Sequence, residues 1–232
     1  DNTLVIYASD NGPDRAEYPY VGDTGPFRGY LGTVHEGSIR TPMMLRWPER
    51  VPSGKVSNEI VSINDIFPTV AALVGGTIPD DRIIDGVDQL PFFLGEQEKS
   101  NRESVMFFAG EKMMAVKWRQ FKIYLYGESP EIDERGYREL WAPQAYNLEL
   151  DPKEQYDLAL QNLWLMSPAL TPMFEYVYSV EKYGLVLPGG EKPELYETSV
   201  PFYSDPALQR TMQAIKTETM KNMVREKLES VK

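Results

Sequence analysis

Apolar residues in the first fifty positions fall into short continuous runs separated by loops. Leu4–Ala8 is such a run, rich in β-branched and aromatic residues, and it is typical of a strand buried on both faces. A Gly- and Pro-rich loop follows as far as about Gly37, and Thr41–Pro48 then predicts a second short strand.

The pattern becomes helical between Ser62 and Gly75. Asn64 or Asp65 is the candidate N-cap, and Pro68 is tolerated because it falls in or near the first turn. Gly75-Gly76 predicts the end of the helix. The order strand, loop, strand, helix favours an α/β sheet.

A charged and polar stretch, Glu96–Glu103, predicts a boundary, so we expect residues 1–103 and 104–232 to form two parts. Three strand-like segments then follow closely, which predicts an antiparallel meander: Val105–Ala109, Met113–Trp118 and Phe121–Tyr126. Tyr146–Leu148 is a further short strand, and residues 168–183 are expected to be helical. A last helix is predicted to begin at Asp205, with Pro206 in its first position. The second part is therefore expected to be α+β.

Charge and composition exclude several classes of function. The net charge is −11, from 24 Lys and Arg against 35 Asp and Glu, and this balance argues against a nucleic-acid partner. The chain has no cysteine, which excludes disulfides and thiolate metal sites within it. The longest apolar stretch, around Ile66–Val74, is far shorter than the roughly 20 residues that span a bilayer.

Asp10 and Asn11 follow the first predicted strand, where open α/β sheets place ligand-binding loops. A carboxylate beside an amide carbonyl supplies two hard oxygen ligands of the kind that Ca²⁺ or Mg²⁺ prefers. Asp-Asn-Gly is also a common turn sequence, so the residues alone leave metal binding and a simple turn both open.

Two further residues are candidates for binding an anionic substrate. His35 is the only histidine of the chain, and Arg28 carries a fixed charge with forked donors. Each also has an ordinary structural interpretation, as a core histidine and as a member of an ion pair. Neither residue decides the function by itself.

Several segments, in this order, resemble the sulfatase family, in particular the bacterial arylsulfatases of the alkaline-phosphatase-like superfamily. The matching segments are LVIYASDNGP (4–13), PFRGYLGTVHEGSIRTPMMLRWP (26–48), SNEIVSINDIFPTVAALVGG (57–76), DDRIIDGVDQLPFFLGEQEKSNRE (80–103), MAVKWRQFKIYL (114–125) and YNLELDPKEQYDL (146–158). The resemblance implies the C-terminal part of an α/β sulfatase domain in residues 1–103. A small α+β subdomain, with an antiparallel sheet and a C-terminal helix, is expected in 104–232.

The resemblance also implies a metal and a nucleophile. Sulfatases hold one divalent cation, usually Ca²⁺, and the family's Asp-Asn pair matches Asp10 and Asn11. The other metal ligands, and the Cys or Ser that becomes formylglycine, lie in the N-terminal part of the family. No Cys/Ser-x-Pro-x-Arg motif occurs in this chain, so we expect it to be a C-terminal portion that is inactive alone.

One position departs from the family pattern. Many sulfatases have a Lys that contacts the sulfate where this sequence has Leu31. Either another residue takes over its role, with Arg28 and His35 as the nearest candidates, or assistance to the leaving group is weak. We expect Arg28 to bind the substrate, and His35, the candidate catalytic residue, to reach the sulfate pocket.

The expected substrate is a small sulfate ester or a sulfated sugar, and the expected location is the periplasm or the exterior of the cell. A phosphodiesterase or phosphonate monoester hydrolase of the same superfamily is the first alternative, and a non-catalytic relative is the second.

Overall fold

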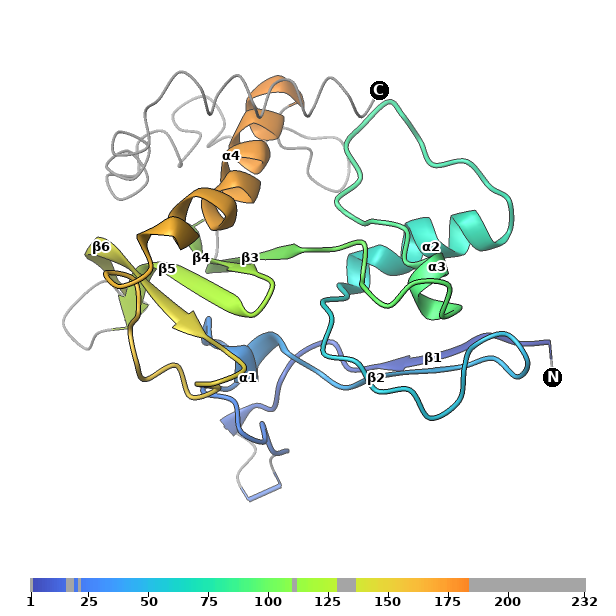
Figure 1. Ribbon diagram of the computed structural model, residues 1–232, viewed down its shortest axis with the longest axis horizontal. Coiled ribbons are helices and arrows are strands. Elements are labelled where there is room, and N and C mark those ends of the chain that lie inside the picture. The colour runs from blue at the N-terminus through green and yellow to red at the C-terminus, as the bar shows by residue number, and fades with distance from the viewer. Residues whose placement is uncertain (1, 16–18, 21, 110–111, 129–136, 184–232) are drawn as a thin grey trace. The chain divides into compact units, whose positions relative to one another are not determined.

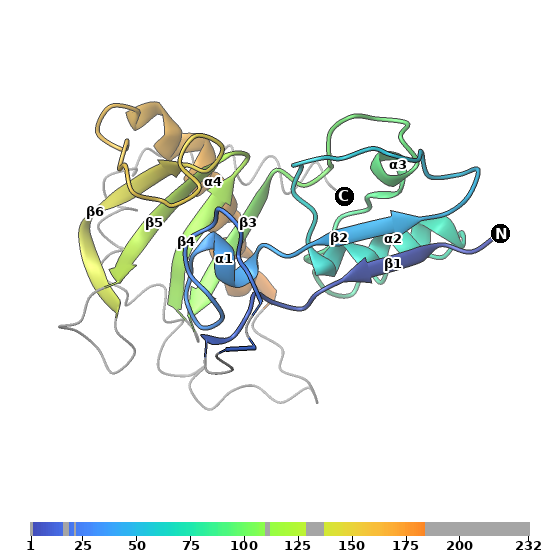
Figure 2. The same ribbon diagram turned by 90° about the horizontal axis from the view of Figure 1, so that it is seen from below.

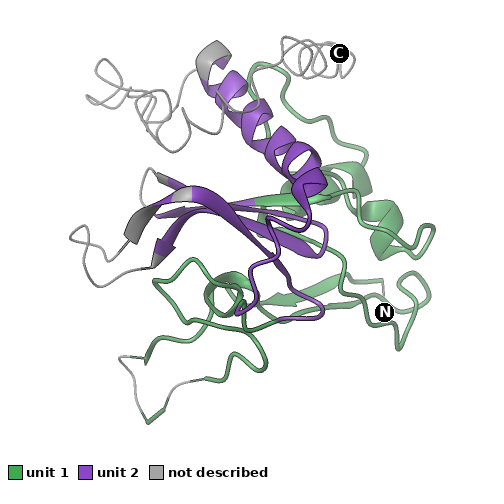
Figure 3. Cartoon of the chain, turned by 60° about the vertical axis from the view of Figure 1, so that its left-hand side comes forward, with its two compact units in different colours: residues 1–105, 152–154 green, residues 106–151, 155–232 purple. Residues whose placement is uncertain are grey.

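The computed structural model describes the chain except residues 1, 16–18, 21, 110–111, 129–136 and 184–232. The chain forms two compact units (Figure 3). The first contains residues 1–105 and 152–154, and the second contains residues 106–151 and 155–232. The domain boundary at residue 103 stays a prediction, because compact units of one chain need not be independent domains.

In the first unit, β1 (Val5–Ala8) pairs antiparallel with β2 (Met43–Arg46), and Val5 lies opposite Arg46 (Figure 2). The prediction that the first strand is buried on both faces is wrong for this chain. Val5 is 48% exposed and Tyr7 is 60% exposed. Within the described residues β1 belongs to a two-stranded sheet, which leaves much of its surface uncovered.

Short helices complete the first unit: α1 (Glu36–Ile39), the 3-10 helix η2 (Ile63–Asp65), α2 (Ile66–Leu73) and α3 (Leu90–Phe93). The helical segment predicted from Ser62 is confirmed, and Asp65, one of the two predicted caps, is the N-cap residue of α2. The side-chain cap, however, is made earlier, at Ser62. The Ser62 side chain accepts from the Asn64 N–H while Asp65 accepts from the Ser62 N–H, which is a capping box. Gly75 adopts a φ of 69° just after the helix, in the left-handed region that favours glycine.

The capping box gives the first testable prediction. Ser62→Ala removes the acceptor for the Asn64 N–H, and we expect it to lower the free energy of unfolding by about 1 kcal/mol in urea denaturation. Ser57→Ala is the control, because Ser57 accepts an N–H bond in an exposed turn outside any helix. Equal stability of the two variants would contradict a capping role for Ser62.

The second unit contains the predicted meander, in the order β3-β4-β5-β6 (Figure 1). Its strands are β3 (Ser104–Ala109), β4 (Lys112–Trp118), β5 (Phe121–Glu128) and β6 (Tyr137–Asn147). β5 pairs antiparallel with both β4 and β6. The last strand is much longer than the predicted Tyr146–Leu148.

A 3-10 helix, η3 (Leu163–Leu165), leads into α4 (Met166–Tyr183), which packs on β4 and β5 and confirms the helix predicted for residues 168–183. The core between them is apolar and buried, and includes Met114, Val116, Ile123, Leu170 and Met173. The helix predicted from Asp205 lies outside the described residues. None of the helices that the structure describes is long and apolar enough to cross a membrane.

Candidate functional site

The turn that carries Asp10 and Asn11 lies directly against α1. The Gly12 N–H donates to the Ser38 carbonyl at 2.7 Å, and the Thr41 hydroxyl donates to the Ser9 carbonyl at 3.2 Å. A Cβ on Gly12 would come within 1.9 Å of the Gly37 carbonyl oxygen. Only glycine permits this approach, so the end of β1 and the start of α1 form one packed element.

The loop before α1 folds back on itself. The Gly37 N–H donates to the Arg28 carbonyl at 2.7 Å, which closes the loop at its base. Gly29 has a φ of 87°, and a Cβ there would lie 2.7 Å from the His35 Cβ. The Leu31 N–H donates to the Pro13 carbonyl at 2.9 Å and ties the loop to the turn after β1. The two segments singled out from the sequence are therefore neighbours.

Asp10 and Asn11 form a tight local turn. Asp10 is exposed, and its Oδ1 accepts from the Asn11 N–H at 2.9 Å. The Asn11 side-chain amide donates to the Gly12 carbonyl at 2.9 Å, which leaves its oxygen Oδ1 as the atom suited to a cation. Among the residues that the structure describes, no group of three His, Cys, Asp or Glu side chains could hold a metal. The pair fits the donor chemistry of Ca²⁺, but only as part of a larger set of ligands.

Arg28 and His35 are both held by a turn that is distant in the sequence. The Arg28 backbone N–H donates to the Pro152 carbonyl and its guanidinium NH1 donates to the Glu154 carbonyl, both at 3.2 Å. His35 is 5% exposed, and its Nδ1 lies 3.9 Å from Oε2 of Glu154. Leu31, at the position of the family's Lys, is 38% exposed.

Glu154 is the residue of this site that the sequence did not single out. Its side chain is buried, and Oε1 accepts from the Glu36 N–H at 3.0 Å. The only signal for it was the similarity of YNLELDPKEQYDL (146–158) to the family, which names a segment and not a role.

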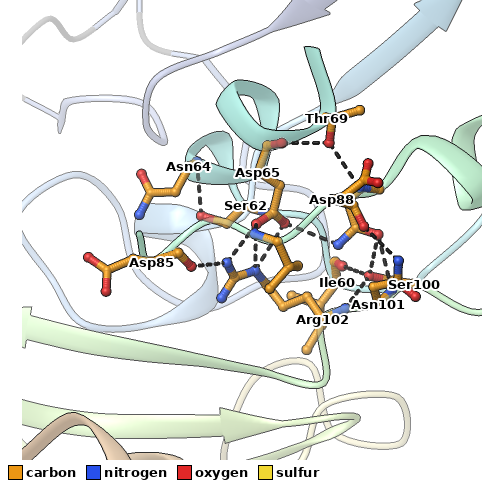
Figure 4. Close-up of polar contacts among 12 residues, drawn as sticks. Ile60, Ser62, Asn64, Asp65, Thr69, Asp85, Asp88, Ser100, Asn101 and Arg102 are labelled. Atoms are coloured by element: carbon orange, nitrogen blue, oxygen red, sulfur yellow. Dashed lines mark hydrogen bonds and ion pairs between the residues drawn. The ribbon is translucent and has the colours of Figure 1, made fainter. Parts of the chain in front are cut away.

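A second polar cluster lies around Asp65 and Arg102 (Figure 4). Arg102 Nε is 3.0 Å from Asp65 Oδ2, and its NH2 is 2.6 Å from Oδ1. The Val87 N–H and the Gln89 side-chain amide also donate to the same carboxylate. Burial acts to raise the pKa of Asp65, but the hydrogen bonds and the charge of Arg102 outweigh it, and the pKa of Asp65 is lowered.

The remaining contacts of this second cluster join segments of the chain. Arg102 NH2 also donates to the Asp85 carbonyl at 2.6 Å, and the Ser100 hydroxyl donates to the Ile60 carbonyl. Gln89 Oε1 accepts from the Asn101 N–H at 3.0 Å. The cluster is thus occupied by contacts within the protein, and we assign it to holding residues 85–102 against η2 and α2.

Comparison with known proteins adds an independent finding. Residues 1–76 match the model of the Sulfatase family. The chain is 38% identical over 121 residues to the mouse steryl-sulfatase (Mus musculus), an alignment that covers 50% of this chain and 19% of the relative. It is 39% identical over 127 residues to the dog N-acetylgalactosamine-6-sulfatase (Canis lupus familiaris), covering 54% of this chain and 24% of that protein. The chain thus spans about a fifth to a quarter of these relatives.

Solved structures agree. The PsFucS1 sulfatase of Pseudoalteromonas sp. superposes with a TM-score of 0.70 at 32% identity, covering 78% of this chain and 38% of that protein. A Bacteroides thetaiotaomicron structure, described in the context of the metabolism of multiple glycosaminoglycans, superposes with a TM-score of 0.61 at 29% identity. It covers 78% of this chain and 39% of the other. These likenesses to sulfatase structures confirm the predicted α/β fold class, whereas the division into an α/β part and an α+β part at residue 103 stays a prediction.

Proposed function

We propose that the chain belongs to the sulfatase family, whose model its first 76 residues match, and that it is part of an enzyme that hydrolyses sulfate esters. The observation that carries the proposal is the contact between Gly12 and Ser38. It holds the Asp10-Asn11 turn against the helix that begins after His35, so the candidate metal ligands and a candidate substrate-binding residue share one packed element.

We propose that Asp10 Oδ2 and Asn11 Oδ1 supply two of the ligands of a Ca²⁺ ion, with Mg²⁺ as the alternative metal. When bound, such a cation would act as a Lewis acid that polarises a sulfate oxygen. The chain's own contribution would be to hold these two oxygens at the end of β1, through the Gly12–Ser38 contact. Arg28 would bind the sulfate, which a chain with a net charge of −11 has to attract by local positive charge, and His35 would reach the sulfate pocket.

The nucleophile would have to come from outside residues 1–232, because the chain has no cysteine and no Cys/Ser-x-Pro-x-Arg motif. We propose that it is a formylglycine and that residues 1–232 alone are inactive.

The names of the relatives indicate two substrate classes, steroid sulfates and sulfated amino sugars. We propose a sulfated sugar or a small aryl sulfate, handled in an exported enzyme. A phosphodiester or phosphonate substrate is the alternative, and one observation favours it, namely that Leu31 stands where many sulfatases have a Lys.

The test is Asp10→Ala in the complete enzyme, co-expressed with a formylglycine-generating system. We expect the rate of aryl sulfate hydrolysis by Asp10→Ala to be about a hundredfold or more below that of wild type, because one hard metal ligand is missing. In wild type, we expect a chelator to abolish the same activity by removing the metal. Asp81→Ala is the control, since Asp81 is an exposed residue paired with Arg82. Preference of the wild type for a phosphodiester over the aryl sulfate would overturn the named reaction.

A further inference from the structure

One buried glutamate, Glu154, contacts both candidate residues of the sulfate site, Arg28 and His35. Glu154 is 1% exposed and comes from a turn 118 residues away from Glu36 in the sequence. Through its carbonyl it accepts from Arg28, and through its carboxylate it faces His35 and the Glu36 N–H. Glu154 therefore contacts Arg28 through its backbone and His35 through its side chain.

The backbone conformation at Glu154 would suit a glycine better than a glutamate. The presence of a glutamate is therefore explained by the contacts of its side chain and not by the turn. Its φ is 55°, in the left-handed region where a glycine costs less than any residue with a Cβ. A carboxylate buried at this position also costs free energy unless polar groups stabilise it. A glycine would avoid both the backbone strain and the burial of a charge. The contacts of the Glu154 carboxylate must therefore offset these two costs.

The two carboxylate oxygens face different groups. Oε1 makes a hydrogen bond of 3.0 Å with the Glu36 N–H, which fixes the first turn of α1. Oε2 lies 3.9 Å from His35 Nδ1, beyond hydrogen-bonding distance but close enough for the charge to act on the ring. A carboxylate beside Nδ1 favours the tautomer with its proton on that nitrogen, and it leaves Nε2 as the acceptor of the ring, suited to taking a hydrogen bond or a proton and not to donating to a sulfate oxygen.

We propose that Glu154 is a positioning residue for the sulfate site, whose negative charge sets the orientation and tautomer of His35. This inference rests on the proposed function only for its effect on catalysis. The contact between Glu154 and His35 can be tested without any turnover.

The first test uses the chain of residues 1–232 with ¹⁵N-labelled histidine. His35 is the only histidine in it, so the ring nitrogens give one unambiguous set of signals. Glu154→Gln keeps an acceptor for the Glu36 N–H but removes the charge. We expect it to move the Nδ1 and Nε2 shifts, whereas Glu149→Gln, at an exposed position of the same segment, leaves them in place. Unchanged shifts in Glu154→Gln would overturn the proposal.

The second test uses the complete enzyme and a double-mutant cycle with His35→Phe. We expect Glu154→Gln to lower kcat by about tenfold or more with a smaller change in KM, the usual order for a group that orients a functional side chain. In the His35→Phe background the same change should have little further effect, because the two residues act as one unit. Additive effects, or wild-type kcat in Glu154→Gln, would show that the charge does not act through His35. Altered shifts in an enzyme with no sulfatase activity would instead refute the proposed function and leave the contact standing.

Discussion

Replacing Arg102 by methionine is expected to lower the free energy of unfolding by about 3–5 kcal/mol, the largest loss of stability we predict for a single side chain. The substitution keeps most of the apolar stem but removes the guanidinium that bonds to both oxygens of Asp65. Because Asp65 is fully buried, its charge is then left with neutral donors alone. Urea denaturation of wild type and variant measures the difference.

Arg82→Met is the matched control. Arg82 and Asp81 form a bidentate pair of similar geometry, with Nε–Oδ1 and NH2–Oδ2 distances of 2.8 Å. Both side chains are more than 60% exposed, so water solvates Asp81 when its partner is removed. We expect no measurable change in stability. A similar loss in both variants would mean that burial is not what gives the Asp65–Arg102 pair its importance.

The effect of Arg102→Met should depend on pH in a defined direction. In wild type the pKa of Asp65 is lowered, so its contribution to stability is present above the unfolded value of about 3.9 and is lost as pH falls through the folded value. Without Arg102, burial is the largest remaining influence on the Asp65 pKa, and it favours the protonated acid. The stability difference should therefore be largest at neutral pH, begin to shrink as pH falls through the range where Asp65 of the variant takes up a proton, and continue to shrink down to the lowered wild-type pKa. A difference that stays constant with pH would contradict a charge-based cause.

The local sequence pattern predicted most helices and strands of the fold. It failed for the length of β6 and for the exposure of β1, which depend on neighbouring strands. The meander and α4 follow from strand-like and helical spacing that their own residues carry. Strand β6 was mostly missed because Pro143 and charged residues interrupt its pattern. Pro143 is tolerated because β6 lies at the edge of the sheet, and the register shifts between Tyr124 and Tyr126, opposite this region. The exposure of β1 depends on which neighbours it has, and its own sequence does not contain that information.

The residues of the candidate site likewise fall into those that the sequence could predict and those that it could not. Asp10, Asn11, Arg28 and His35 could be singled out because residue type and family resemblance both point to them. Glu154 could not, since its role depends on a contact across more than a hundred residues of chain and on a side chain directed into a buried position. The Asp65–Arg102 pair was missed for the same reason, being formed by residues 37 positions apart.

The contact that brings the predicted ligands to α1 should be destroyed by a single methyl group. Gly12→Ala places a Cβ 1.9 Å from the Gly37 carbonyl oxygen and 3.1 Å from the Ser38 carbonyl carbon. Both are backbone atoms, which cannot rotate away as a side chain can, so the turn after β1 has to move away from α1. We expect a loss of about 1–3 kcal/mol in the free energy of unfolding, measured in urea.

The same movement should reach the metal site if the proposed function is correct. Asp10 and Asn11 directly precede Gly12, and the hydrogen bond from the Gly12 N–H to the Ser38 carbonyl is one of the contacts that fix their position relative to His35. Calorimetric titration of the complete enzyme with Ca²⁺ is expected to show affinity weakened by about tenfold, equivalent to about 1.4 kcal/mol. Gly22→Ala is the control, because its Cβ would meet only the Pro13 side chain, at 3.3 Å. Weakened Ca²⁺ binding in Gly12→Ala but not in Gly22→Ala would tie the metal to this turn, whereas unchanged affinity in an otherwise destabilised Gly12→Ala would place the metal elsewhere.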